Sequence, residues 1–149
     1  MRDVDRAATL LVSDGHTCVL CRGDAVLTSD SRGVAPIIDW LSEGVDMTGF
    51  SVADRVTGRA VALLYAACGL VQAYSVLASE PAIAVCTAHG IGIKADQLVP
   101  QIMNRDGDGP CPMELVVAGI DDPAQAAQLL EAALISKRRA NGMTGAVNC

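Results

Sequence analysis

The chain has 149 residues, a formal net charge of −6 and 51% hydrophobic residues, with only one Trp, one Phe and two Tyr. This length is typical of one domain whose core is built from aliphatic side chains. The acidic balance, without a lysine or arginine stripe, argues against a nucleic-acid partner. Gly69 and Gln72 interrupt the longest apolar run, so no segment is expected to cross a membrane.

Six cysteines raise the question of disulfides or zinc. Residues 1–5 are charged and no apolar segment typical of a secretory signal follows them, so we expect reduced cysteines and a cytoplasmic protein. Only Cys18 and Cys21 are spaced like metal ligands, and neither a second pair nor a flanking His completes a zinc site. We therefore expect no metal and no cofactor.

The first half of the chain shows helical and strand periodicity in turn. The predicted elements are, in chain order, a helix at 3–13, strands at 16–22 and 25–28, and helices at 34–43 and 51–68. The connection at 23–24 suits a tight hairpin turn. Cys18 and Cys21 would point to opposite faces of their strand and so be structural. Ser51 is the expected cap of the fifth element, with Asp54 three residues later as in a capping box.

The second half alternates between the same two element types. The predicted elements are a strand at 71–77, a helix at 79–90, a short strand at 91–95, a helix at 110–118 and a last helix beginning at Pro123. Asp122 would cap this last helix and the basic residues 137–139 would compensate its dipole. The order predicts a three-layer α/β fold with a mixed sheet between helices. We expect one domain at 1–139 and a fraying tail at 140–149.

The stretch at 104–114 looks least like simple connecting sequence, because it combines glycines, prolines, charges and a cysteine between two apolar runs. Gly107 and Gly109 would allow backbone N–H groups to turn toward an anion. Pro110 and Pro112 remove two such donors, and the Lys-Ser/Thr ending of a P-loop is missing. The stretch is therefore a poorer phosphate cradle than its glycines suggest.

Cys111 and Glu114 are the candidate catalytic residues of this stretch. A thiolate at a helix start is favoured by the helix dipole, and Arg105 could add to that effect. Glu114 would share the face of Cys111 and could act as a base. The same residues also fit a buried cysteine beside a glutamate that caps its own helix. Asn104 and Arg105 either contribute to a ligand site or hold the loop closed.

Six short blocks carry a resemblance to a known family. They are Ser31 with Gly33-Val34 and Pro36, Asp54-Arg55-Val56 with Gly58-Arg59-Ala60, Ser79-Glu80 with Ala82, Gly90-Ile91, Asn104-Arg105 with Gly107 and Gly109, and Cys111-Pro112-Met113-Glu114. Over about residues 12–118 the chain resembles a bacterial and archaeal family of unknown function whose members look like cytidine deaminases in fold. The resemblance implies a cytidine-deaminase-like fold.

The comparison with zinc deaminases is informative because their metal ligands are missing. These enzymes place His or Cys with Glu at the start of one helix and Pro-Cys-x-x-Cys at the start of the next. The stretches that we align with these motifs are 54–58 and 80–85, where Ala82 and Val85 replace the two cysteines. The resemblance therefore implies a protein that is not a zinc-dependent deaminase and leaves open whether it is an enzyme.

The resemblance also implies a remnant cleft at helix N-termini that binds a nucleotide-like small molecule. The expected ligand-binding residues are Asp54, Arg55, Arg59, Ser79, Glu80, Asn104, Arg105, Gly107 and Gly109. The alternatives are that Asp54 caps its helix and that Arg55 pairs with Glu80 or another acidic residue. Two other hypotheses stay open: a cysteine-dependent enzyme that uses Cys111, and a homodimeric interaction protein built on its alanine-rich helices.

Overall fold

The computed structural model describes residues 1–142, which form one five-stranded sheet and six helices. The strands are β1 (Cys18–Arg22), β2 (Ala25–Ser29), β3 (Ser51–Thr57), β4 (Gln72–Ser79) and β5 (Gly92–Val99). The helices are α1 (Asp3–Ser13), α2 (Ala35–Ser42), α3 (Arg59–Ala67), α4 (Glu80–Ala88), α5 (Pro112–Val116) and α6 (Pro123–Ala140).

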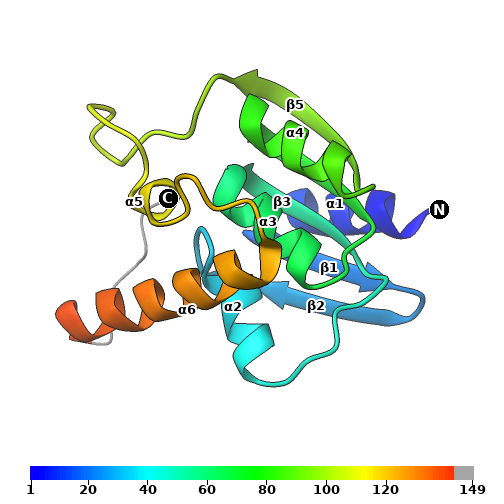
Figure 1. Ribbon diagram of the computed structural model, residues 1–149. Helices are drawn as coiled ribbons and strands as arrows, with labels where there is room; N and C mark the ends of the chain where they lie inside the picture. Colours follow the sequence, from blue (N-terminus) through cyan, green and yellow to red (C-terminus); the bar gives the residue numbers. More distant parts are fainter. Residues whose placement is uncertain (143–149) are drawn as a thin grey trace.

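The sheet is mixed, and its strand order is β2-β1-β3-β4-β5 (Figure 1). Strand β1 is antiparallel to both of its neighbours, whereas β3, β4 and β5 run parallel to one another. Helix α1 packs on one face of the sheet, and α2, α3, α4 and α6 belong to the larger core on the other face. The expectation of an α/β protein with a mixed sheet covered by helices is confirmed.

Strand β1 is buried on both faces of the sheet. Cys18 and Leu20 belong to the larger core, whereas Val19 and Cys21 pack with α1 in a smaller one. This alternation is the two-residue period of a strand. The prediction that Cys18 and Cys21 point to opposite faces is confirmed, and both are buried free cysteines.

Side-chain caps begin two of the later helices, and the predicted Asp122 cap is confirmed. Ser79 accepts a hydrogen bond from Ala82 N (3.2 Å) at the start of α4, and Asp122 accepts one from Gln125 N (3.1 Å) at the start of α6. In both cases a proline occupies the first turn, where its missing N–H costs nothing. At the other end of α6, Arg138 forms a two-pronged ion pair with Asp39 of α2 (2.7 and 2.9 Å).

The expectation of one helix over 51–68 is wrong, because residues 51–57 form strand β3 and only Arg59–Ala67 is helical. The spacing of Ser51 and Asp54 imitates a capping box, but the segment is rich in β-branched residues and lies in the sheet centre between β1 and β4. Gly58 separates the strand from the helix.

Two other boundaries differ from the prediction. Strand β5 has eight residues rather than the five expected at 91–95, and the helix expected at 110–118 is limited to five residues at 112–116. The tail was expected to begin at 140, where α6 ends; its part at 143–149 lies outside the described residues. Within residues 1–142 no helix has both the length and the apolar character needed to cross a membrane.

Candidate functional site

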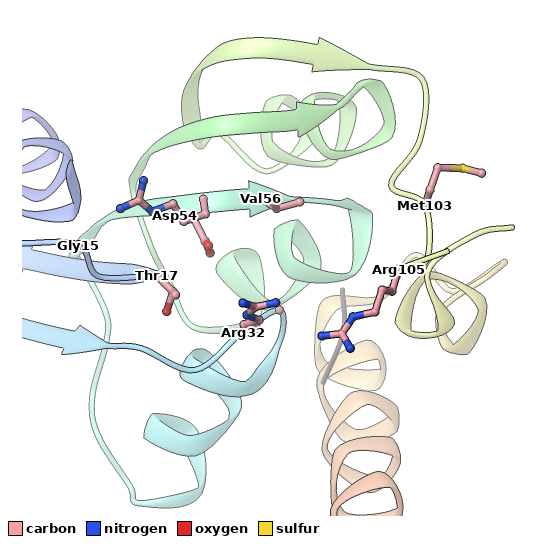
Figure 2. A pocket seen from close by; sticks show the side chains of 9 residues that line it. Gly15, Thr17, Arg32, Asp54, Val56, Met103 and Arg105 are labelled. Atoms are coloured by element: carbon pink, nitrogen blue, oxygen red, sulfur yellow. The ribbon is translucent and has the colours of Figure 1, made fainter. Parts of the chain in front are cut away.

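A pocket of about 500 Å³ opens where β3 approaches its end and β1 begins. Its lining comes from the turn before β1 (Gly15 and Thr17), the segment before α2 (Arg32 and Gly33), strand β3 (Asp54, Arg55 and Val56) and the loop after β5 (Met103 and Arg105). We call it the Asp54 pocket (Figure 2). Its volume is within the range of small-molecule sites.

Asp54 supplies a buried carboxyl group to this pocket. It lies in the central strand β3, is 6% exposed, and its Oδ2 lies 2.8 Å from the hydroxyl of Tyr65 on α3. Burial raises the pKa of the Asp54 carboxyl to about 7, although hydrogen bonds from Tyr65 and from the backbone N–H groups of Arg55 and Val56 oppose the rise. Asp54 can therefore gain or lose a proton near neutral pH.

A chain of buried hydroxyl groups lies behind Asp54, and the number of its hydrogen bonds depends on the protonation of that carboxyl. Tyr65 Oη lies 3.1 Å from Thr57 Oγ1, which lies 3.0 Å from Ser75 Oγ, and Ser75 donates to the carbonyl oxygen of Leu77 at 2.8 Å. Together with the Asp54–Tyr65 contact, the chain has four contacts, and each needs one proton to be a hydrogen bond. The three hydroxyl groups supply only three protons. All four become hydrogen bonds when the carboxyl of Asp54 is protonated and donates to Tyr65. When Asp54 is ionised, Tyr65 donates to it and the Tyr65–Thr57 contact has no proton.

Two arginines without a partner in the described part of the chain lie at the pocket. Arg32 precedes α2, Arg105 belongs to the loop after β5, and both are exposed. In Figure 2 their side chains lie along one side of the pocket while Asp54 points into it from β3. Among the hydrogen bonds and ion pairs of residues 1–142, neither guanidinium takes part in one. Unpaired guanidinium groups at a cavity are suited to a phosphate or carboxylate ligand.

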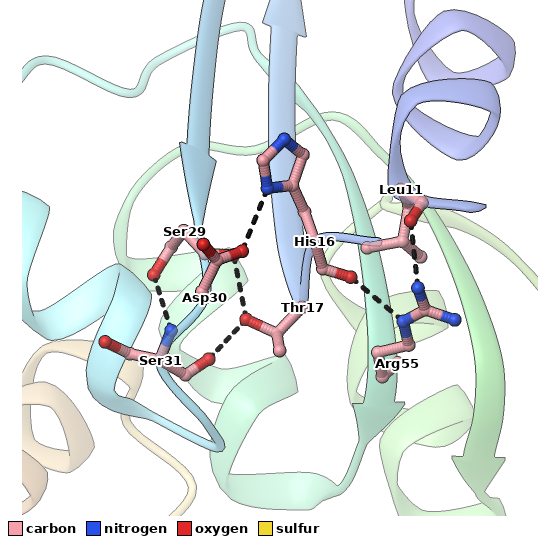
Figure 3. A network of polar contacts seen from close by, with 7 residues as sticks. All are labelled: Leu11, His16, Thr17, Ser29, Asp30, Ser31 and Arg55. Atoms are coloured by element: carbon pink, nitrogen blue, oxygen red, sulfur yellow. Dashed lines mark hydrogen bonds and ion pairs between the residues drawn. The ribbon is translucent and has the colours of Figure 1, made fainter. Parts of the chain in front are cut away.

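The segment that carries Arg32 is fixed to the start of β1 by polar contacts (Figure 3). The Thr17 hydroxyl lies 2.8 Å from the carbonyl oxygen of Ser29 and close to that of Ser31, and Ser31 N donates to Ser29 Oγ at 3.1 Å. His16 Nδ1 lies 2.9 Å from Asp30 Oδ1. These contacts hold the backbone around Arg32 in place before any ligand binds.

Arg55 and Arg59, both predicted to bind a ligand, have internal roles. Arg55 donates to the carbonyl oxygens of His16 and Leu11 (both 2.9 Å), which ties the end of α1 to the sheet (Figure 3). Arg59 donates to the carbonyl oxygen of Val117 (2.7 Å) and pairs with Asp121 (2.9 Å). The suggested pairing of Arg55 with Glu80 is not formed, so these two guanidinium groups are left out of the proposed site.

Glu114 caps helix α3 rather than its own helix. Its Oε2 accepts a hydrogen bond from Ala60 N (3.1 Å), and the backbone N–H of Arg59 also contributes. Burial raises the pKa of Glu114, and these N–H groups and the Arg59 charge oppose the rise. A Cβ on Gly58 would lie 1.9 Å from Glu114 Oε1 and 2.8 Å from Ile102 Cγ1, so these side chains would have to shift and the cap would be disturbed. The carboxylate is engaged and does not serve as a base for Cys111.

Cys111 offers no accessible thiol. Its side chain is 1% exposed and it is disulfide-bonded. The expectation that the cysteines stay reduced is wrong for Cys111, and a nucleophilic thiolate at this position is not formed. That expectation rested on the charged residues at 1–5, which say nothing of which sulfur atoms the fold brings together.

The other predicted residues do not share the Asp54 pocket. Asn104 bonds with Asp108 through Nδ2 (2.8 Å) and Oδ1 (3.2 Å), so it holds the glycine-rich loop closed, as one of the two interpretations proposed. Ser79 caps α4 and lines a different hollow beside Arg59. Glu80, Gly107 and Gly109 lie outside the pocket lining. Of the predicted set, Asp54, Arg55 and Arg105 line the pocket, and Arg55 does so while its guanidinium is bound elsewhere.

Sequence reasoning missed Arg32, Thr17 and Tyr65. Arg32 lies inside the family-like block that begins at Ser31, and this neighbourhood was the available signal. Nothing local marks Thr17 or Tyr65, because their roles depend on partners in other elements.

The sequence matches a protein-family model over residues 6–134, and that model describes a domain of unknown function, DUF1893. The chain belongs to the DUF1893 family. The fold of this DUF1893 protein is similar to the crystal structure of a DUF1893 family protein from Thermotoga maritima, with a TM-score of 0.79 and 21% sequence identity over 89% of this chain and 91% of that one. At this identity the likeness concerns the fold alone. Comparison with curated protein sequences finds no match.

The comparison with zinc deaminases needs one correction in this DUF1893 protein. Residues 54–57, aligned with the first metal-binding helix start, belong to strand β3, while residues 80–85 do begin a helix. Within the part of the chain that the structure describes, no three His, Cys, Asp or Glu side chains are grouped so that they could hold a metal ion.

Proposed function

We propose that the Asp54 pocket binds a nucleotide-like small molecule through an anionic group. The observation that carries this proposal is that a buried carboxyl group, Asp54, and two guanidinium groups without a partner among residues 1–142, Arg32 and Arg105, line one cavity of about 500 Å³. A buried ionisable group with a shifted pKa beside charged side chains on one cavity is typical of ligand sites.

Each part of the pocket suits one part of such a ligand. Arg32 and Arg105 would hold a phosphate by charge-assisted hydrogen bonds. Asp54 would accept from a sugar hydroxyl or a base N–H when ionised, or donate to a base oxygen or nitrogen when protonated. Val56 and Met103 supply apolar surface for a flat ring. The preference for a nucleotide over other phosphorylated molecules rests on the cytidine-deaminase-like fold that the sequence blocks imply, which stays an expectation.

Thermal-shift measurements with nucleosides, nucleoside 5′-monophosphates and inorganic phosphate test this proposal. We expect nucleotides to raise the melting temperature more than nucleosides do, because only nucleotides contact the arginines. Arg32→Ala and Arg105→Ala should each weaken nucleotide binding by about tenfold or more. Arg139→Ala, at the exposed end of α6, is the matched control and should bind like the wild type. Equal shifts in all four proteins, or no shift with any compound, would contradict the proposal.

A further inference from the structure

Strand β5 is an open edge of the sheet. It pairs with β4 on one side, and no strand of the described chain pairs with its other side. It has eight residues and no proline, and most of its side chains are exposed. Proteins usually shorten, cover or interrupt such edges, because unpaired backbone N–H and C=O groups are ready to pair with another strand.

The direction of the unpaired backbone groups can be read from the pairing with β4. Gly92 N donates to the carbonyl oxygen of Val71 (3.3 Å), so the main chain of Gly92 faces β4. Because neighbouring residues of a strand alternate, the N–H and C=O groups of Ile93, Ala95 and Gln97 face outward. A partner strand would bond to these three residues.

We propose that two copies of this chain associate through antiparallel pairing of their β5 strands around a two-fold axis at Ala95. This register places Ala95 opposite Ala95 of the second copy and Ile93 opposite Gln97, so outward-facing groups meet outward-facing groups. It also places Lys94 opposite Asp96 of the second copy, twice by symmetry. The two sheets would join into one continuous sheet.

Charge selects this register over its neighbours. Lys94 and Asp96 are exposed and lie on the same face of β5. If the axis moved to Lys94, two lysines would stand opposite each other, and if it moved to Asp96, two aspartates would do so. Like charges directly opposite are destabilising, and opposite charges stabilise. A lone lysine on an edge discourages pairing, but here each lysine meets a carboxylate.

The remaining side chains on this face fit the same register. Leu98 is 56% exposed and would lie opposite Gly92 of the second copy, where the missing side chain leaves space for it. Tyr74 of β4 donates a hydrogen bond to Asp96, which holds that carboxylate on the face that it shares with Lys94. The pairing therefore needs no rearrangement of β5.

Sedimentation velocity over a range of concentrations, with two charge variants, tests the proposal. The wild type should form dimers. Lys94→Glu alone places two pairs of like negative charges at the interface, and Asp96→Lys alone places two pairs of positive charges. Each variant should raise the dimer dissociation constant by about tenfold or more. An equimolar mixture of the two variants should dimerise again, because the introduced glutamate then meets the introduced lysine, and the remaining Asp96 meets the remaining Lys94.

The mixture separates loss of pairing from loss of folding, since unfolded variants would not restore each other. Lys137→Glu makes the same charge change on α6 and should leave the dimer intact. Ala95→Pro removes an outward N–H that does not bond β4, so it should give a monomer with an unchanged circular dichroism spectrum. A monomeric wild type, or a dimer that tolerates both charge variants and the proline, would overturn the proposal.

Discussion

The free energy of unfolding of Asp54→Asn, relative to that of the wild type, is expected to be about 3 kcal/mol more favourable to the variant at about pH 8 than at about pH 5. The asparagine amide can imitate the protonated carboxyl, donating to Tyr65 and accepting from the backbone N–H groups of Arg55 and Val56. It therefore keeps the chain of buried hydroxyl contacts complete at every pH. The wild type keeps it complete only while Asp54 is protonated.

The direction of this pH dependence follows from the direction of the pKa shift of Asp54. Burial raises the pKa of Asp54 to about 7 in the folded protein, above the value of 3.8 for an exposed carboxyl. The folded state therefore binds the proton more tightly than the unfolded state, and this group's contribution to stability is largest at low pH. It falls by about 1.4 kcal/mol per pH unit as the pH rises between the two values and is constant above the higher one.

Urea unfolding of the wild type and of Asp54→Asn at several pH values measures this effect as the difference between the two proteins. The nearby charges of Arg32 and Arg105 are present in both, so they largely cancel in the difference. Asp24→Asn, which removes a carboxyl in the exposed hairpin turn, is the control variant. A difference between the wild type and Asp54→Asn that is independent of pH would mean that Asp54 titrates like an exposed carboxyl.

Glu114→Ala is expected to lower the free energy of unfolding by about 2 kcal/mol, because it removes the partner of buried N–H groups at the start of α3. Gly58→Ala should have an effect of similar size, since its Cβ would occupy the position of Glu114 Oε1 and displace the carboxylate. The two changes break the same interaction, so their effects should not add.

A double-mutant cycle by chemical denaturation checks this coupling. In the Glu114→Ala background, Gly58→Ala should cost clearly less than it does in the wild type, because no carboxylate remains to be displaced and only the contact with Ile102 is left. Glu114→Gln keeps an acceptor oxygen and should be less destabilising than alanine. Strict additivity of the two alanine substitutions would show that Gly58 is not selected by Glu114.

Local signals in the sequence were sufficient to predict the helices whose N-cap residue bonds within the same helix. Ser79 and Asp122 are followed by proline and bond to residues three positions later, so their helices could be placed from a few residues. The alternation of buried side chains in β1 was equally local. The prediction of one helix at 51–68 failed for two reasons. A central strand that is buried on both faces has no polar alternation, and Ser51 with Asp54 imitates a helix cap.

The candidate site could be predicted only in part, for a physical reason. The arginines of the family-like blocks look alike in sequence, but Arg55 and Arg59 are bound by carbonyl oxygens in distant segments, whereas Arg32 and Arg105 are not. Glu114 seemed placed to serve its own helix and instead caps α3, which begins more than fifty residues earlier. Whether a charged side chain is engaged depends on long-range packing, which a single sequence does not encode in its local pattern.

The most direct test of the ligand-binding account is an NMR titration of the wild-type protein with nucleoside 5′-monophosphates, followed through backbone amide signals. If the ligand binds in the Asp54 pocket, the amides of Gly15, Gly33 and Val56, which line it, should show saturable shifts, and these shifts should be lost in the Arg32→Ala, Arg105→Ala double variant. Gly119, which lines a different hollow, should not move. Shifts centred on Gly119, or no saturable shift at the pocket amides, would contradict it.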